Sequence, residues 1–210
     1  LRHYSQLIAY MSLHGEEKKW GGQSSLEGKR LAVFCEQGLG DAIQMSRFFK
    51  PLKKKGCYLI VQCNEALVSL FQTTMPYIDK VESKTDVVEG RGSEFDYHVP
   101  SMSLPLLLDS PRPSGGHRYM RFLAKEIADK DLRVGIVWQG SKLHPNDQYR
   151  SCGFGYFESL FDLPGIKWFN LQLDPLDHPK IINTEFKDLT DTADLISTLD
   201  LVISIDTSIL

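Results

Sequence analysis

A glycine-rich turn after a short apolar stretch places an acidic residue where it could act on a ligand. Leu31–Cys35 carries no charge, Glu36-Gln37-Gly38-Leu39-Gly40 follows it, and Asp41 stands at the start of a new pattern. Backbone N–H groups at a helix start favour a negative charge, and open α/β sheets bind ligands where their strands end. Asp41 is therefore a candidate functional carboxylate. Its alternative role is the N-cap of a helix.

A dinucleotide site is the competing interpretation of this turn. Gly38 and Gly40 match the first two glycines of G-x-G-x-x-G, but Ile43 stands at the third position. Ile43 would crowd the close packing of helix on strand that the third glycine permits, and Asp41 would repel a bound pyrophosphate. The match is weak, which disfavours NAD binding.

The surrounding elements repeat one plan of strand, small-residue turn and helix. Ala42, Met45, Phe48 and Leu52 recur at helical spacing, and Pro51 is expected to shorten that helix. Further strands are predicted at Cys57–Val61, Phe95–Val99, Arg133–Trp138, Lys167–Leu171 and Leu201–Ile205, and two strand-like pieces in Val81–Glu89. Helices are predicted at Ala66–Phe71 after Asn64-Glu65, at Arg118–Ala128, around Phe154–Phe161, and at Ala193–Leu199 with Asp191-Thr192 as its cap. The alternation predicts an α/β protein with parallel sheets covered by helices on both faces.

The same pattern suggests how the chain divides. Prolines and glycines between Asp109 and Gly116 interrupt it, so we expect a first Rossmann-like domain at 20–116, a connecting helix at 117–131 and a second domain at 132–210. Residues 1–19 are expected to be a helical linker or the end of something upstream. Because no helix follows the last strand, the second domain is expected to be incomplete.

Composition excludes several classes of protein. The chain has 210 residues, 42% of them hydrophobic, and a net charge of −3. Through Lys130 we count 18 basic against 15 acidic residues and afterwards 6 against 12, so neither part is basic enough for general nucleic-acid binding. No apolar run approaches the roughly 20 residues that span a membrane, and no signal peptide is evident. Cys35, Cys57, Cys63 and Cys152 form no metal-binding spacing, which favours a cytoplasmic protein with neither zinc nor disulfides.

A series of short motifs resembles a known family. In chain order they are Trp20-Gly21, Leu26–Arg30, EQGLGD (36–41), Ser103-Leu104-Pro105, VGIVWQGS (134–141), Asn146–Ser151, Leu171-Gln172, DTADLI (191–196) and LDLVISIDTS (199–208). The series resembles the glycosyltransferase domain that is attached to tetratricopeptide repeats in bacterial proteins, related to the heptosyltransferases of glycosyltransferase family 9. The resemblance covers Trp20 to the end of the chain. The family continues past its D-T-S with a helix start that helps to hold the donor, and this sequence ends before it.

The resemblance implies a GT-B architecture, with two Rossmann-like domains facing each other, an acceptor bound by the first and a nucleotide-sugar by the second, and no metal or other cofactor. It makes Asp41 the catalytic base, since an attacking sugar hydroxyl must lose a proton. The acceptor could be a glycan, a lipid-linked sugar or a protein, with contacts from Glu36, Gln37, Gly38 and Gly40. Residues 1–19 would then join upstream helical repeats.

The resemblance also implies where the donor binds. A leaving diphosphate needs cations or N–H groups around it, and Arg150, with its planar fork, and Lys142 lie in the polar loop after the second domain's first strand. The alternative is that Arg150 pairs with Asp147. Further donor contacts are expected from Gly140, Ser141, Gln172, Asp206, Thr207 and Ser208. The last three could equally form a helix N-cap.

Two other functions stay open at this point. A non-catalytic member of the family would use the same fold to bind a sugar or a partner. A Rossmann oxidoreductase is the other alternative, against which the missing third glycine argues.

Overall fold

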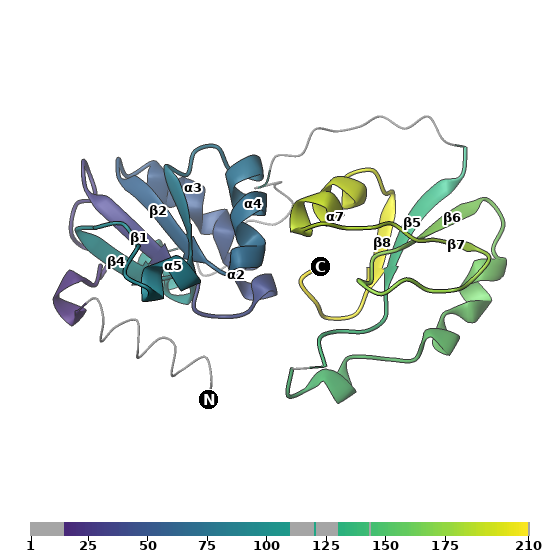
Figure 1. Ribbon diagram of the computed structural model, residues 1–210. Helices are drawn as coiled ribbons and strands as arrows, with labels where there is room; N and C mark the ends of the chain where they lie inside the picture. Colours follow the sequence, from purple (N-terminus) through teal and green to yellow (C-terminus); the bar gives the residue numbers. More distant parts are fainter. Residues whose placement is uncertain (1–14, 110–119, 121–129, 143, 210) are drawn as a thin grey trace. The chain divides into compact units, whose positions relative to one another are not determined.

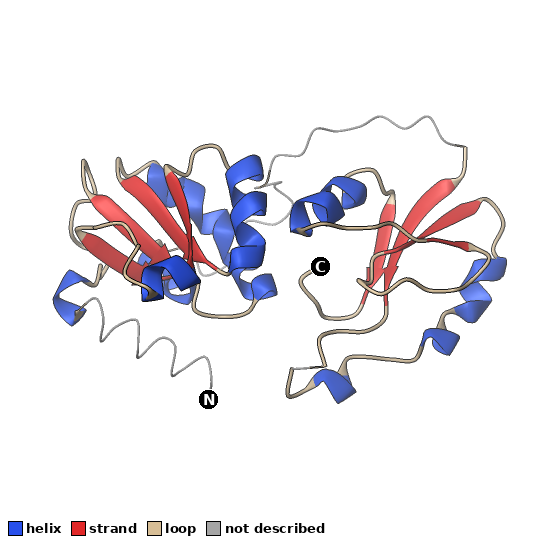
Figure 2. Cartoon of the chain, viewed as in Figure 1, coloured by secondary structure: helices blue, strands red, loops and turns tan. Residues whose placement is uncertain are grey.

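The computed structural model describes residues 15–109, 120, 130–142 and 144–209. The predictions for residues 1–14 and nearly all of the predicted connecting helix lie outside these residues. The chain divides into two compact units, Leu1–Arg121 and Phe122–Leu210, each with its own four-stranded parallel sheet. Figure 1 traces the elements of both units, and Figure 2 marks their strands and helices. The predicted fold class, α/β with two Rossmann-like parallel sheets as in GT-B proteins, is confirmed.

The first unit is built on four parallel strands in the order β3-β2-β1-β4. These strands are β1 (Arg30–Phe34), β2 (Tyr58–Cys63), β3 (Lys80–Ser83) and β4 (Tyr97–Pro100). Its α-helices are α2 (Leu39–Met45), α3 (Phe49–Lys53), α4 (Glu65–Thr74), α5 (Lys84–Val88) and α6 (Leu104–Leu107). Short 3₁₀ turns are η1 (Glu16–Lys18), η2 (Ser46–Phe48) and η3 (Ser101–Ser103).

Strand order explains why helices cover both faces of this sheet. The chain moves in one direction from β1 through β2 to β3 and then returns to β4 on the far side of β1. Because crossover connections are right-handed, the return must lie on the opposite face from α2, α3 and α4. Consistent with this, α5 packs Val87 against Phe34, the last residue of β1.

Several predicted elements of the first unit need correction. Lys84–Val88 is a helix, not a second strand-like piece, because Ser83 caps it by accepting a hydrogen bond from the Asp86 N–H at 3.1 Å. The single helix predicted after Asp41 is instead two short helices, α2 and α3, which the 3₁₀ turn η2 separates. The chain stays helical through Pro51 to Lys53, so Pro51 does not shorten the helix at its end; Pro51 has no N–H to donate to the carbonyl of Arg47, which lies within η2.

The second unit repeats the arrangement with strand order β7-β6-β5-β8. Its strands are β5 (Leu132–Val137), β6 (Ile166–Asn170), β7 (Ile181–Ile182) and β8 (Leu201–Ser204). Its helical elements are η4 (Asp147–Tyr149), η5 (Phe154–Tyr156), η6 (Glu158–Asp162) and α7 (Leu189–Ile196).

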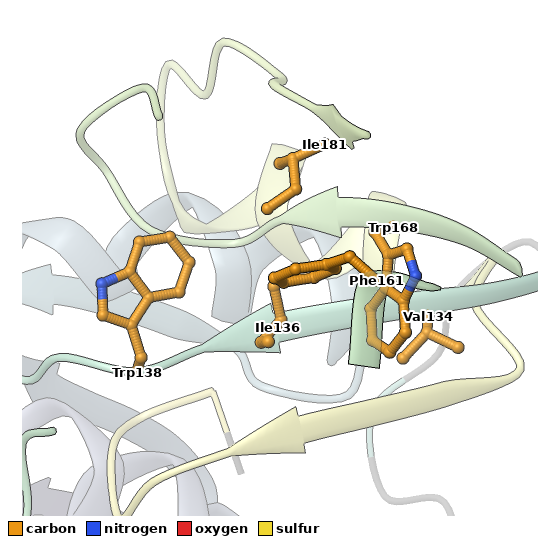
Figure 3. Packing of buried hydrophobic residues seen from close by; sticks show 6 residues of the cluster. All are labelled: Val134, Ile136, Trp138, Phe161, Trp168 and Ile181. Atoms are coloured by element: carbon orange, nitrogen blue, oxygen red, sulfur yellow. The ribbon is translucent and has the colours of Figure 1, made fainter. Parts of the chain in front are cut away.

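A cluster of aromatic and branched side chains forms the core on one face of this second sheet. Val134 and Ile136 of β5 and Trp168 of β6 pack with Phe161 of η6, as Figure 3 shows. The Phe161 ring meets Trp168 edge-on, with centroids 5.0 Å apart. Gly135 faces the other way, where a Cβ would lie 2.6 Å from a methyl group of Leu199, which follows α7. The two faces are thus covered by the 3₁₀ turns and by the segment around α7.

Three predictions for the second unit also need correction. The predicted helix at Phe154–Phe161 is a pair of 3₁₀ turns, because its aromatic side chains fill the core rather than following a helical stripe. The N-cap of α7 is Asp188, whose side chain accepts from the N–H groups of Thr190 and Asp191, so this helix begins four residues earlier than predicted. β8, whose apolar residues predict a buried strand at Leu201–Ile205, is only half-buried, since among the described residues it pairs with β5 alone.

Both sheets are locked at their amino-terminal edges by the same arrangement of side chains. The N–H of Arg30 donates to the Asp96 carboxylate at 2.8 Å, and Arg30 Nε donates to the Glu94 carbonyl. The N–H of Arg133 likewise donates to the Asp200 carboxylate at 2.8 Å, and Arg133 Nε to the Thr198 carbonyl. Each pair, which we call a strand-start lock, joins the first strand of its unit to the last one.

Among the described residues, no helix is long and apolar enough to cross a membrane.

Candidate functional site

The candidate residues of the first unit gather at the carboxyl edge of its sheet. β1 and β4 are neighbours although the chain reverses direction between them, so the edge above them is a topological switch point. The turn after β1 and η3 after β4 border this point. It is where an α/β sheet of this type holds its ligand.

Asp41 lies in the first turn of α2, but it is not the N-cap. The N-cap is Gly38, and Asp41 sits three residues later, where its Oδ2 accepts a hydrogen bond from the Gly38 N–H at 3.2 Å. Within the described part of the chain this is the only hydrogen bond that the Asp41 side chain makes. The side chain is half-buried, so one carboxylate oxygen is occupied in the turn and the other is available to a ligand.

The neighbouring Glu36 is used differently. It is buried, with 3% of its surface exposed, and its carboxylate accepts hydrogen bonds from the Ser101 N–H and hydroxyl, both at 2.9 Å, and from the Met102 N–H at 3.1 Å. Glu36 therefore ties the turn after β1 to η3 across the switch point. Its carboxylate is occupied inside the fold, which leaves the predicted acceptor contact to the other residues of the turn.

The rest of this turn is half-buried: Gln37, Gly38 and Gly40 line it beside Asp41. Gly38 adopts an ordinary extended conformation, with φ of −69°. Glycine is therefore not required there by the backbone angle. Its lack of a side chain instead keeps the approach to Asp41 open.

The second unit brings its candidate residues together at the equivalent edge, above β5 and β8. Arg150 Nε donates to Asp147 Oδ1 at 3.2 Å, and Arg150 Nη1 donates to the backbone carbonyl of Asp206 at 2.8 Å. The predicted alternative, pairing with Asp147, is present. The second bond also links the loop after β5 to the segment after β8, so the two parts of the predicted donor site are adjacent.

The loop between β5 and Cys152 is organised around Asp147. Its Oδ1 also accepts from the Ser151 hydroxyl at 2.8 Å, and that hydroxyl accepts from the Gly140 N–H at 2.9 Å. The guanidinium of Arg150 lies so close above Gly140 that a Cβ there would stand 2.7 Å from Arg150 Nη2. Ser141 and Lys142 follow on the exposed side of the loop.

The remaining predicted donor residues differ in what they do. The side-chain oxygen of Gln172 accepts from the N–H groups of Trp138 and Gln139, at 2.8 and 2.7 Å, and its amide nitrogen donates to the Gln139 carbonyl. Gln172 thus holds the turn after β5 against β6. Asp206 is exposed, whereas Thr207 and Ser208 are half-buried; the Thr207 hydroxyl accepts from the Ile209 N–H at 3.3 Å, as a helix-capping residue does.

Sequence reasoning missed the residues that support these side chains. Ser101, which anchors Glu36, and Ser151, which anchors Asp147 and Gly140, are single hydroxyls without a distinctive spacing. From the sequence, Asp147 was expected only as an alternative partner of Arg150, in place of a phosphate. In the described ranges, no group of three or more His, Cys, Asp and Glu side chains is placed to hold a metal ion. The cysteines are free, and three of the four are buried.

Comparison with known proteins supports the fold described above. No protein family matches the chain's sequence. The chain is 26% identical to Protein FlbA of Caulobacter vibrioides, over an alignment that covers 73% of this chain and 30% of FlbA. Its structure is similar to that of TibC, an iron-containing dodecameric glycosyltransferase from enterotoxigenic E. coli H10407, with a TM-score of 0.61, 13% identity, and coverage of 88% of this chain and 55% of TibC.

These comparisons set the limits of what is shown. The chain has the α/β fold of a bacterial glycosyltransferase and is distantly similar to FlbA. It spans about 30% of FlbA and 55% of TibC.

Proposed function

We propose that this chain is part of a glycosyltransferase that moves a sugar from a nucleotide-diphosphate sugar to a hydroxyl of an acceptor, which is a glycan, a lipid-linked sugar or a protein. The observation that carries the proposal is the position of Asp41. It lies at the switch point of a parallel sheet with one carboxylate oxygen bonded to Gly38 and the other left for a substrate. The likeness to TibC supports the same class of reaction.

In this proposal the first unit binds the acceptor and supplies the base. The acceptor hydroxyl gives its proton to the Asp41 carboxylate while its oxygen attacks the anomeric carbon of the donor sugar. The bond from that carbon to the diphosphate oxygen breaks, and the diphosphate leaves with the bonding electrons. Attack opposite the leaving group inverts the configuration at that carbon.

The second unit holds the donor in this proposal. The negative charge that grows on the diphosphate is met by Arg150, by Lys142 and by backbone N–H groups of the Gly140-Ser141 turn. Arg150 keeps donors beyond the two that bond to Asp147 and Asp206, and its planar fork suits two phosphate oxygens at once. Asp206, Thr207 and Ser208 border the same position.

The decisive experiment substitutes Asp41→Asn in the full-length protein and measures sugar transfer together with the affinity for a panel of nucleoside diphosphates. Asparagine keeps an oxygen that can accept from Gly38, but it cannot take a proton. We expect transfer to fall by about 10²–10⁴-fold while nucleotide affinity stays within twofold.

Asp191→Asn is the matched control. Asp191 sits in the first turn of α7, and its carboxylate accepts from the Lys187 N–H at 2.9 Å, so it has the same local role in another helix. Its substitution should leave transfer unchanged. Transfer that survives Asp41→Asn would make Asp41 a structural residue only.

A non-catalytic binding module is the second candidate, and the structure gives one reason to keep it. Glu36, Gln172 and Arg150 are all engaged by other residues of the chain, as expected of side chains that only stabilise a fold. In that case the full-length protein would bind a sugar or nucleotide without either transfer or hydrolysis of any nucleotide-sugar tested.

A further inference from the structure

A lysine that the proposed reaction does not use reaches across the carboxyl edge of the first sheet. Lys84 directly follows β3, yet its Nζ lies 5.0 Å from the ring centroid of Phe34, the last residue of β1. Since β2 stands between these two strands, the side chain must pass over the end of β2, where Cys63 is the last residue. The ammonium group is therefore held at the same edge as the Glu36–Asp41 turn.

Lys84 has no direct anionic partner among the described residues, although Glu36 lies near enough to act on its pKa. Within residues 15–109 the structure gives its ammonium group neither an ion pair nor a hydrogen bond. Burial lowers the pKa of Lys84, and the nearby Cys35, Cys63 and Glu36 act in the opposite direction without overcoming it. The pKa of Lys84 is lowered overall because burial disfavours the charged ammonium group more than the nearby anionic groups favour it.

The neighbours explain why the anionic groups near Lys84 act on it only weakly. Burial raises the pKa of Cys63 to about 12 and the pKa of Cys35 well above its ordinary value, so both thiols are neutral near pH 7. Glu36 is the only carboxylate among these groups; hydrogen bonds from Ser101 and Met102 hold its oxygens, and it acts on Lys84 without forming an ion pair with it. An incoming anion would thus find an ammonium group with its donors unused.

We propose that Lys84 is the centre of an anion-binding site at the carboxyl edge of the first sheet, and that it takes a phosphate or carboxylate group of the molecule bound by this unit. A charge-assisted hydrogen bond from a partly desolvated ammonium group to such an oxygen is stronger than the same bond in water. Where this builds on the function proposed above, it narrows the substrate class: the acceptor carries an anionic group beside the hydroxyl that is glycosylated.

Binding of simple anions tests the site without requiring any sugar transfer. The ¹⁵N-labelled chain is titrated with inorganic phosphate and, separately, with acetate, at constant ionic strength set with sodium chloride. We expect saturable shifts of the backbone amide signals of Cys35, Cys63 and Lys84. The anion that binds more tightly identifies the group as phosphate or carboxylate.

Substitution of the lysine shows whether it is responsible. Lys84→Met keeps the length and the apolar stem, and it should weaken the apparent affinity by about tenfold or more. Lys50→Met, on the exposed surface of α3, removes the same charge and should leave the affinity unchanged. Saturable binding that persists in Lys84→Met, or no saturable shift in the unsubstituted chain, would overturn the proposal and leave Lys84 as a cover for the Phe34 ring.

A second measurement does not depend on how well the variant folds. The pKa of Lys84 is followed in the unsubstituted chain through the NMR signal of its ε-carbon, with and without phosphate. A bound anion should raise this pKa toward the ordinary value of lysine, and an unchanged pKa contradicts the site.

The link to the reaction is tested last, in the full-length protein. Lys84→Met should raise KM for an anionic acceptor and leave KM for a neutral analogue unchanged, with Lys84→Arg intermediate. If simple anions bind but no sugar is transferred to any acceptor, the site stands and the proposed reaction fails.

Discussion

Two carboxylates stand five residues apart in one turn and do different work. Both carboxylate oxygens of Glu36 accept hydrogen bonds, from Ser101 and Met102, whereas a single oxygen of Asp41 accepts one from Gly38. Loss of the buried Glu36 side chain, as in Glu36→Ala, would leave three donors without an acceptor, which is costly inside a protein. At the scale of single residues, Glu36 therefore shapes the turn and Asp41 is the one that can meet a substrate.

A second buried carboxylate of the first unit, Glu82, gives the fold a predictable response to acid. Burial pushes the pKa of Glu82 upward, but hydrogen bonds from Ser93, Lys80 and Gln62 together hold it below its ordinary value. A depressed pKa adds stability above the unfolded value of about 4.3, and this is lost as pH falls through the folded pKa. We expect Glu82→Gln to be destabilised relative to the unsubstituted chain at about pH 7 and much less so at about pH 3.

Urea unfolding of both proteins at the two pH values measures this difference. Glu94→Gln, at an exposed position of the same unit, is the control and should give the same small difference at both. A penalty for Glu82→Gln that does not change with pH would show that Glu82 acts through packing and not through its charge.

Residue types near the two edges could be predicted from the sequence, but their partners could not. Asp41 and Arg150 were identified because a carboxylate after a glycine turn and an arginine in a polar loop have chemistry of their own. That Glu36 would be taken up by Ser101, or that Arg150 would reach the carbonyl of Asp206, depends on contacts 65 and 56 residues apart in sequence. No local pattern carries that information.

Among the elements, the loop that carries Arg150 is the one most open to a direct test. An added methyl group at Gly140 would meet Arg150 Nη2 and Asp147 Oδ1, both at 2.7 Å. The arginine end can move aside, but Asp147 Oδ1 is held by Arg150 and Ser151, so Gly140→Ala should cost about 1 kcal/mol of stability. The displaced arginine should nevertheless weaken nucleoside-diphosphate binding by about tenfold.

Calorimetric titration and thermal unfolding of the same variant separate the two effects. At Gly155, where an added Cβ meets nothing within 4 Å, substitution by alanine should change neither measurement. Unchanged nucleotide binding in Gly140→Ala would remove Arg150 from the proposed donor site.

Element types were predictable where one local signal dominated. Asn64-Glu65 is a cap signal for the helix predicted at Ala66–Phe71, and the Asn64 side chain does accept from the Ala66 N–H at 3.0 Å at the start of α4. The prediction of two strand-like pieces in Val81–Glu89 is wrong for Lys84–Val88, where Ser83 and Asp86 form a helix cap. The helix predicted around Phe154–Phe161 is wrong as well, since the stacked rings of these two residues pack into the core from two short turns.

The molecule as a whole consists of two compact units, each with its own sheet and core. Compact units of this kind can in principle unfold separately. The strand-start locks allow the stability of each unit to be changed separately, because Asp96 joins β1 to β4 and Asp200 joins β5 to β8. Asp96→Ala should lower the melting temperature of the first unit alone and Asp200→Ala that of the second, each through a loss of about 1 kcal/mol.

Differential scanning calorimetry, with amide hydrogen exchange to assign each transition, measures the effect. The two variants serve as controls for each other. A single transition that moves equally in both would show that the units unfold as one cooperative body.

The general architecture followed from the alternation of strands and helices, since parallel sheets need crossovers of this kind. The likeness to TibC, at 13% identity, shows how little of the sequence such an architecture requires. The alternation does not predict what the loops after β1 and β5 would bind. That depends on side chains such as Arg150, whose positions are set by the conformation of the loops.

The repeated lock between arginine and aspartate has an evolutionary consequence. Each sheet has its alignment fixed at the edge opposite to the one that bears the candidate chemistry, so mutations in the loops after β1, β4, β5 and β8 can accumulate without letting strands slip. Descendants of such a chain can therefore change what these loops bind, while the opposite edge of each sheet keeps its strands aligned.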